Sequence, residues 1–459
     1  MGTWALIAPE GLLLAGALAA LFSDVLFGGR DRAGAWVGAV AATLAASMSV
    51  AAGSGGPALF SGQFAVDGAT QVVRTATLVL TAVFLVWLAS AGLDRGRVRE
   101  FAALVLFASL GSLLMAAARD WIVLLLALEA ATMPAYVLMG FDRGDDRSLE
   151  GALKYFLLSM VASALFMYGV SFVVGMSGST ALAASRLQSG AIGLVAITFI
   201  FAGLLAKLSA APFQWWSPDA YAGAPSAAVA FVSSVPKVAG LFALARVAAV
   251  LTPQAPAAAP LLVAAAVASM LIGNLAALSQ TDIRRLMAYS GVAHAGYLLV
   301  GLAAGTVAGM RAAVFYAIAY AIPSMGIMLV AARHGDTLDA VRGLASRRPW
   351  VAWATVLMLV SLVGIPPLAG FTGKLFLFSA AMDAGLVWLA AFSVTMSVLS
   401  AGYYLRIVRA MFFTPVDAAA TQSQGAPLAA SAVVAALALS TLAVGVAASP
   451  LLAAIVFGR

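Results

Sequence analysis

The stretch FIFAGLLAKLSAAPFQWWSPDAYAGAP, residues 199–225, contains the feature that decides the fold. Lys207 stands in an apolar run, and Pro212 follows five residues later. Proline cannot donate the backbone hydrogen bond to the carbonyl four residues earlier, so the carbonyl of Leu208 is freed. Non-helical backbone at membrane depth is tolerated only where protein or a water-filled cavity satisfies it. The stretch therefore predicts a transmembrane helix that is interrupted beside a buried cation.

The composition indicates a membrane protein along the whole chain. Its 459 residues are 63% hydrophobic and 9% charged, with a mean hydropathy of +1.04, whereas about a quarter of a soluble globular chain is charged. Apolar runs of about 20 residues recur, which predicts a polytopic helical protein; a transmembrane β-barrel would show short alternating segments instead. No loop is long enough to fold alone. Because the N-terminus lacks a basic region before its first apolar run, we do not expect a cleaved signal peptide.

The same composition excludes several kinds of cofactor site. There is no cysteine, which excludes disulfides, thiol nucleophiles and Cys-ligated iron–sulfur clusters. Only two histidines occur, and since His334 is expected in a polar loop, a bis-histidine haem is not supported. Neither a Walker A motif nor a dinucleotide-binding GxGxxG motif is found. We read the net charge of +7, spread over loops, as a topology signal and not as a nucleic-acid-binding surface.

Apolar runs and loop charges together predict the topology. The two spans at 99–118 and 120–141 are separate only if ARDW, residues 118–121, forms a turn. With that turn, fifteen of the 21 arginines fall near loops that follow odd-numbered spans and six on the other side, so the positive-inside rule places both termini outside. The predicted fold is all-α, with about fourteen spans at 3–27, 34–53, 68–92, 99–118, 120–141, 151–175, 190–212, 226–250, 257–278, 283–305, 309–332, 350–372, 385–413 and 428–457.

The four lysines are distributed differently from the arginines. Lys154, Lys207, Lys237 and Lys374 each fall within or at the edge of an apolar span or re-entrant stretch, whereas the loop cations are arginines. A GC-rich genome would favour arginine codons, but this does not explain why lysine persists where burial is expected. Lysine can lose its proton when desolvated and arginine effectively cannot, so we interpret the lysines as proton-handling groups. The structural alternative is snorkelling to an interface, which fits Lys154 best because it is near the start of a span.

Two further ionisable residues lie in the middle of apolar spans. Glu129 is central in the fifth span, and its structural alternative is a Glu–Lys pair that only holds helices together. His294 could pack in the core or take part in a proton relay. Glu10 differs, because it follows Pro9 in the first turn of a helix, where the helix dipole favours an anion; we interpret it as structural.

Prolines accompany these charges. Pro134 follows Glu129, Pro236 precedes Lys237, and GIPPLAGFTGK, residues 364–374, ends at a lysine. After the first break, Ser217 is expected to cap a short restarted helix with Pro218 at its first position. Spans 7 and 12 therefore look discontinuous. Broken helices five spans apart are typical of inverted-repeat transporters, and we pair spans 4–8 with spans 9–13.

Five stretches resemble a known family. They closely resemble the antiporter-like subunits of respiratory complex I, the proton-pumping NADH:quinone oxidoreductase, which are related to cation/proton antiporter subunits. The resemblance covers roughly residues 70–410, Pro9–Glu10 also fits, and KYFLL and PFQWWSPDAY favour subunit N over subunits L and M. The stretches are LALEAATMPAYVLMG, ALKYFLLSMVASALFMYGVSF, KLSAAPFQWWSPDAYAGAPSAAVAFVSSVPKVAG, LSQTDIRRLMAYSGVAHAGYLLVGL and LVGIPPLAGFTGKLFLF.

The resemblance implies a line of proton-transferring groups at the membrane midplane. By motif, the line would comprise Glu129 of helix 5, Lys154 of helix 6, Lys207 of helix 7, Lys237 of helix 8, His294 of helix 10 and Lys374 of helix 12. The resemblance also implies two inverted five-helix repeats with helices 7 and 12 broken. Gln214, Ala222 and Ala227 depart from the family's frequent His, Glu and Pro at these positions, so hydration near the first break could differ.

The resemblance also implies partners and a location. The chain is expected to be one subunit of a hetero-oligomer in the bacterial inner membrane, in contact with lipid and with the other membrane subunits, including the other antiporter-like ones. It would bind no nucleic acid and carry no cofactor, because flavin, iron–sulfur clusters and quinone would belong to other subunits. Its expected divisions are residues 1–98 (three helices), 99–250 (first repeat), 251–413 (second repeat) and 414–459 (last helix).

Two other functions stay open at the level of sequence. The chain could instead belong to a multi-subunit cation/proton antiporter or a membrane-bound hydrogenase-type complex. Alternatively, it could be a membrane scaffold whose charges only pair helices. Neighbouring genes would separate the first alternative from complex I, and variants that remove the charges would separate the second.

Overall fold

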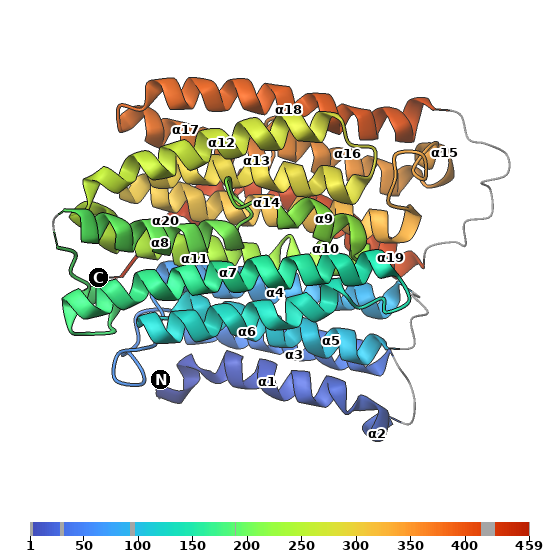
Figure 1. Cartoon of the computed structure of the whole chain (residues 1–459). Coiled ribbons are helices and arrows are strands. Elements are labelled where there is room, and N and C mark those ends of the chain that lie inside the picture. Colours follow the sequence, from blue (N-terminus) through green and yellow to red (C-terminus); the bar gives the residue numbers. More distant parts are fainter. Residues whose placement is uncertain (1–2, 28–31, 92–96, 189, 415–426, 459) are drawn as a thin grey trace.

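The computed structural model describes residues 3–27, 32–91, 97–188, 190–414 and 427–458, and they form one bundle of helices (Figure 1). Within these ranges, eleven helices are long and apolar enough to cross a membrane. Three shorter apolar helices, Ala8–Leu21, Ala191–Lys207 and Pro349–Val363, fall in predicted spans 1, 7 and 12. The prediction of about fourteen membrane-spanning segments is therefore confirmed.

The helices before the second repeat follow the predicted spans closely. Short 3-10 turns lie at Thr3–Leu6 (η1) and Leu182–Ala184 (η2). The helices are α1 (Ala8–Leu21), α2 (Ser23–Phe27), α3 (Ala33–Ala52), α4 (Gly68–Ser90), α5 (Val98–Ala117), α6 (Trp121–Met139), α7 (Asp146–Ser177), α8 (Ala191–Lys207), α9 (Trp216–Gly223), α10 (Ser226–Val232) and α11 (Val235–Leu251).

The second half of the chain follows in the same manner. Two further 3-10 turns, η3 (Thr252–Gln254) and η4 (Pro256–Ala258), join the halves. His334, which we expected in a polar loop, is instead the last residue of α14. The helices are α12 (Ala259–Leu278), α13 (Ile283–Ala303), α14 (Val307–His334), α15 (Leu344–Arg347), α16 (Pro349–Val363), α17 (Ala369–Asp383), α18 (Val387–Phe413), α19 (Leu428–Val446) and α20 (Ala448–Ala454).

The turn on which the topology depended is present. Helix α5 ends at Ala117 and α6 begins at Trp121. Asp120 caps α6, because its side chain accepts hydrogen bonds from the amides of Ile122 at 2.9 Å and Val123 at 3.3 Å. Such a cap satisfies amides that have no partner in the first helical turn.

Helices α5–α11 and α12–α18 are the two inverted repeats, and equivalent contacts support their correspondence. In the first repeat, Gly111 of α5 lies against the backbone of Ala131 in α6, so closely that a Cβ at Gly111 would stand 2.2 Å from the Ala131 nitrogen. In the second repeat, a Cβ at Gly273 of α12 would stand 2.4 Å from the nitrogen of Ala293 in α13. The same close approach of the first two helices thus occurs in both repeats.

The seventh and twelfth transmembrane helices are broken, as predicted. The first break separates α8 from α9, and the second separates α16 from α17. The expected cap was wrong: α9 begins at Trp216, and the Ser217 hydroxyl bonds the Gln214 carbonyl. Pro218 fits the first helical turn, where amides have no intrahelical acceptor, so the helix does not need to start there.

The eighth transmembrane helix carries an interruption that we did not predict. Our expected continuous span 226–250 consists of α10 and α11, separated by Ser233 and Ser234. The Ser234 hydroxyl bonds the carbonyls of Ala230 at 2.7 Å and Phe231 at 3.0 Å. Pro236 follows in the first turn of α11, so Lys237 lies at the N-terminal end of a helix.

A cluster of polar contacts joins segments at one end of the bundle. Asp67 caps α4 through the Thr70 amide at 2.8 Å and also pairs with Arg119 at 2.8 Å and Arg246 at 3.3 Å. The Gly458 amide donates to the same carboxylate. We call these five residues the Asp67 cluster; it connects α4, the α5–α6 turn, α11 and the C-terminal segment.

The first helix is held by another buried pair. Glu10 lies in the first turn of α1, as predicted, and binds Arg74 of α4 at 2.6 Å. Both side chains are buried. Arg74 also donates to the Leu6 carbonyl, which agrees with a structural role for Glu10.

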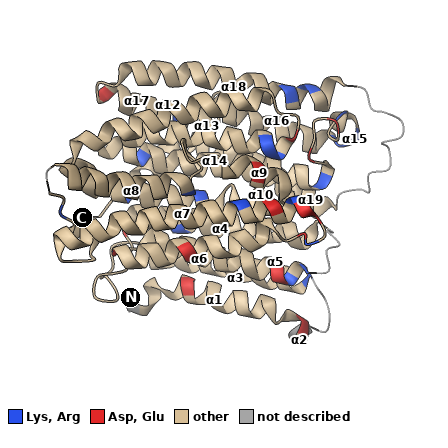
Figure 2. Cartoon of the chain, in the orientation of Figure 1, with Lys and Arg blue, Asp and Glu red and all other residues tan. Residues whose placement is uncertain are grey.

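Charged residues gather unevenly along the bundle. Figure 2 shows Lys, Arg, Asp and Glu concentrated at the end of the bundle that carries α15, away from the N and C labels. Both labels lie at the opposite end in Figure 1. Arg74 and Arg246, counted as near the loops of the less basic side, are buried within α4 and α11. Arg30, Arg95 and Arg459, which contributed to the predicted orientation, lie outside the described residues.

Candidate functional site: charges beside the helix breaks

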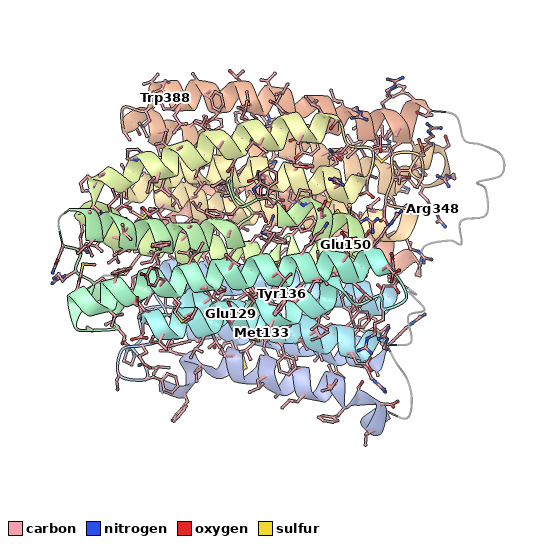
Figure 3. All side chains as sticks on the ribbon, viewed as in Figure 1. Glu129, Met133, Tyr136, Glu150, Arg348 and Trp388 are labelled. Atoms are coloured by element: carbon pink, nitrogen blue, oxygen red, sulfur yellow. The ribbon has the colours of Figure 1, made fainter. Side chains whose placement is uncertain are left out.

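Glu129 and Lys207 meet between the first-repeat helices. Their Oε1 and Nζ atoms are 3.3 Å apart, and the side chains are 17% and 7% exposed. Figure 3 labels Glu129 near the middle of α6, Tyr136 nearer its C-terminal end, and Glu150 and Arg348 toward the charge-rich end. Lys207 is the last residue of α8, where the helix dipole favours a cation. Pro134 lies within α6 and does not end that helix.

Hydroxyl groups extend this pair. Lys207 Nζ donates to Ser159 at 2.6 Å and to Tyr136 at 3.4 Å, and the Tyr136 hydroxyl donates to Ser159 at 2.7 Å. The Ser163 hydroxyl donates to Glu129. The lysine and the carboxylate thus share a connected set of exchangeable protons.

Lys237 has a different environment. Its ammonium nitrogen is buried and has no hydrogen-bond partner among the described residues. It lies 5.5 Å from the centre of the Tyr221 ring, close enough for a cation–π contact. Its position in the first turn of α11 places it at the end of a helix where the dipole disfavours a cation.

His294 is buried between two tyrosine hydroxyls. Tyr316 lies 2.7 Å from Nδ1 and Tyr404 lies 3.0 Å from Nε2. A neutral imidazole donates from one nitrogen and accepts at the other. The two hydroxyls can therefore satisfy either tautomer, and Ser290 extends the connection through the Tyr404 hydroxyl at 2.5 Å.

Lys374 binds the second helix break. Pro366 and Pro367 cannot donate to the carbonyls four residues earlier, those of Leu362 and Val363. Lys374 Nζ donates to these same two carbonyls, at 2.9 Å and 3.0 Å. A third hydrogen bond, to the Ser397 hydroxyl, is 2.7 Å long. The buried ammonium thus replaces the backbone bonds that the prolines remove.

Lys154 stands apart from the other lysines. It forms ion pairs with Glu150 at 2.7 Å and with Asp219 at 2.9 Å, and its side chain is 43% exposed. Burial was expected at the lysines, and this one is not buried. Arg285 binds Asp219 as well, at 3.4 Å. Lys154 therefore connects α7 to α9 where the broken helix restarts.

The three departures from the family pattern lie around the first break. Gln214 is buried, and its Oε1 has no hydrogen-bond partner in the described part of the chain. Ala222 is half-buried in α9. Ala227 is the second residue of α10, a position where proline would also be tolerated.

The tyrosine and serine residues whose hydroxyl groups surround the buried charges were not identified from the sequence. Tyrosines of membrane helices usually gather at the two interfaces. Tyr316, Tyr320 and Tyr404 instead stand within apolar helices and are buried. Their positions away from span ends were a usable signal. No metal site accompanies them: within the described residues, no group of three or more His, Asp or Glu side chains could hold a metal ion.

Two inverted five-helix repeats with broken helices, and buried charges beside the breaks, define an antiporter-like membrane protein. Residues 118–400 match the family described as NADH:quinone oxidoreductase/Mrp antiporter, transmembrane. A relative in Methylobacterium nodulans, named NADH-quinone oxidoreductase subunit N, is 40% identical over 90% of this chain and 88% of its own length. A relative of the same name in Laribacter hongkongensis is 39% identical, covering 88% of this chain and 87% of its own.

Solved structures agree with these relatives. A chain of respiratory complex I from Thermus thermophilus is 33% identical, with a TM-score of 0.83 over 98% of this chain and all of that one. A chain of the Mrp complex from Dietzia shares the fold, with a TM-score of 0.86 at 24% identity over 99% of this chain and 96% of its own. The chain belongs to the NADH-quinone oxidoreductase subunit N family.

Proposed function

We propose that this chain is a proton-translocating membrane subunit of an NADH:quinone oxidoreductase. Protons would pass along a line of ionisable groups and water, while quinone reduction takes place elsewhere in the complex. Glu129 and Lys207 form its first station, Lys237 the centre, and His294 and Lys374 the second half. Lys154, exposed beside the restarted helix, would exchange protons with water.

One observation carries this proposal. Neither Lys237 nor Lys374 has a carboxylate within ion-pair distance among the residues that the structure describes. A charge buried in a membrane is costly, and a scaffold would offset that cost by pairing each lysine with an acid. Lys374 is compensated by backbone carbonyls and a hydroxyl instead, but Lys237 has no hydrogen-bond partner of any kind in the described residues. Lys237 therefore favours a group that gains and loses a proton over one that ties helices together.

The charge distribution supports an orientation. Since basic loops stay on the cytoplasmic side, the end that carries α15 would face the cytoplasm and both termini the outside of the bacterial inner membrane. We also propose functional divisions at residues 1–98, 99–250, 251–413 and 414–459. Residues 415–426, near the start of the last of these divisions, lie outside the described residues.

The partners follow from the family. The relatives are named as subunits of NADH-quinone oxidoreductase, so we propose the other membrane subunits, including further antiporter-like ones, as neighbours of this chain. Flavin, iron–sulfur clusters and quinone would be bound by other subunits. Purifying the tagged chain tests this: redox subunits should co-purify, whereas an antiporter assembly would bring none.

Lys237 provides the sharpest test of the proton line. Lys237→Arg keeps the charge, but its guanidinium does not release a proton under working conditions. We expect normal assembly on a native gel and strongly reduced proton pumping in inverted vesicles, with Lys237→Ala at least as severe. Arg342→Lys is a matched control, because Arg342 forms an exposed pair with Asp339. If the Lys237→Arg complex pumps like the parent while the Lys237→Ala complex does not, the site needs only a fixed charge.

A further inference from the structure

Gly291 of α13 faces the ammonium group of Lys237, the centre of the proposed proton line, and the hydroxyl group of Tyr320. A Cβ atom at Gly291 would lie 2.9 Å from Lys237 Nζ and 2.9 Å from the Tyr320 hydroxyl oxygen. Outside its own stretch of helix, these are the only two atoms within 4 Å of that point. The space in front of Gly291 is thus bounded by one ammonium group and one phenol.

Gly291 does not serve close helix packing. A Cβ at Gly273, by contrast, would collide with the backbone of Ala293. Glycine within a helix is less stable than alanine, and Gly291 lies well inside α13. Since no neighbouring backbone requires glycine here, what the missing side chain provides is space.

A small cavity occupies this space. Its volume is about 10 Å³, and Lys237, Gly291 and Tyr320 line it together with apolar side chains such as Leu208 and Leu298. A cavity needs at least about 10–15 Å³ to hold one water molecule, which must also find at least two polar partners, so this cavity is at the lower limit for a single water. Larger ligands do not fit, and the ammonium group disfavours a cation.

We propose that one water molecule binds in this cavity between Lys237 and Tyr320, and that Gly291 is the residue that keeps its place open. The water accepts a hydrogen bond from Lys237 Nζ, which otherwise has no partner in the described residues. Buried polar groups generally have a partner, from protein or from ordered water. Gly291 and Tyr320 are then positioning residues for proton exchange at Lys237, a role that rests on the proposed proton line.

The tyrosine connects the water site to the second half of the line. Its ring packs on that of His294, with centroids 4.8 Å apart, and its hydroxyl contacts Ser324 at 3.5 Å. Ser324 in turn donates to Ser233 at the α10–α11 interruption, at 3.1 Å. A water held between Lys237 and Tyr320 would therefore contact both α11 and α14.

Gly291→Ala in the assembled complex is the test. The new methyl group would displace the water without removing an ionisable group. It would stand 2.9 Å from both Lys237 Nζ and the Tyr320 hydroxyl oxygen, so both side-chain ends must shift slightly. Because neither atom belongs to the backbone, we expect normal assembly. Since displacing a reacting group by about 1 Å can cost about 100-fold, we expect proton pumping to fall by at least about tenfold. Gly240→Ala is the matched control: it lies in α11, and its Cβ would meet only Leu208 Cδ2 at an ordinary 3.6 Å.

Two further measurements separate the water site from the proton line. Electron cryo-microscopy of the parent complex should show density within hydrogen-bond distance of both Lys237 Nζ and the Tyr320 hydroxyl, and Gly291→Ala should lack it. Tyr320→Phe should also reduce pumping. Absence of the density, or pumping by Gly291→Ala equal to that of Gly240→Ala, overturns the inference even if Lys237→Ala is inactive. If Lys237→Ala pumps like the parent, the proton line fails instead, and the density alone decides the water site.

Discussion

The Asp67 cluster allows the contribution of one carboxylate to be measured. Asp67→Asn keeps a side-chain oxygen that can still cap α4, and Asn and Asp cap helices about equally well. It removes the charge opposite Arg119 and Arg246, whose side chains are only 18% and 10% exposed. Removing one partner of a buried ion pair costs about 3–5 kcal/mol. Partial exposure places Asp67→Asn at the lower end, about 3 kcal/mol, and losing the cap in Asp67→Ala adds about 1 kcal/mol.

The assay is thermal denaturation of the purified complex, followed by the release of this chain on native gels. We expect the midpoint to fall in the order parent, Asp67→Asn, Asp67→Ala. The control is Asp24→Asn, since Asp24 pairs with Arg99 at a site where the two side chains are 45% and 29% exposed. Such exposed pairs contribute about 0–1 kcal/mol, so its midpoint should stay close to that of the parent.

Activity provides a second readout for the same variants. Arg246 lies in α11, the helix that carries Lys237, but the Asp67 cluster shares no residue with the proposed proton line. Asp67→Asn complexes that remain assembled at low temperature should therefore pump protons as the parent does. A melting midpoint of Asp67→Asn equal to that of Asp24→Asn would refute the argument, because it would mean that the buried arginines do not depend on this carboxylate.

Three other changes test individual stations. Glu129→Gln keeps a hydrogen-bonding oxygen but removes the charge beside Lys207, so we expect assembled complexes in which pumping and quinone reduction fall together; unchanged rates would make Glu129 a helix tether. Lys374→Arg preserves a cation for the freed carbonyls of the second break, so assembly should persist in native gels while vesicle pumping falls; full pumping would show that a fixed charge suffices. Lys154→Ala removes two exposed ion pairs, each contributing about 0–1 kcal/mol, so its melting midpoint should stay close to that of the parent and any fall in pumping would report on proton exchange; a large loss of stability would instead show that the pairs hold α9.

The topology could be predicted because the sequence features that indicate it are long, as the apolar runs are, or occur repeatedly, as the loop arginines do. Each span is a run of apolar residues, and paired prolines marked the break between α16 and α17. The α10–α11 interruption was missed because it depends on Ser233 and Ser234, whose hydroxyl groups compete for nearby carbonyls only in the folded geometry. Lys374 lies within α17, which extends eleven residues past the predicted end at 372.

The candidate site was predictable to the extent that its members are charged. An isolated lysine or glutamate in an apolar helix stands out, which identified Glu129, Lys207, Lys237 and Lys374. Their hydroxyl partners did not stand out, because serine and tyrosine occur throughout the chain. The contact between Lys207 and Ser159 joins positions 48 residues apart. Such pairing depends on helix rotation and packing, which apolar periodicity alone does not determine.

The partners of the three buried lysines differ in kind, and this bears on how a proton could move between them. Lys207 has a carboxylate and hydroxyls, and Lys374 has two backbone carbonyls and a hydroxyl. A carboxylate can itself take up a proton, whereas a carbonyl remains a fixed dipole. Lys237, between them in the proposed line, has neither and faces a cavity of about one water. A proton at Lys237 is therefore held by the fewest protein contacts, and this central lysine is the station where a bound water would have the largest effect.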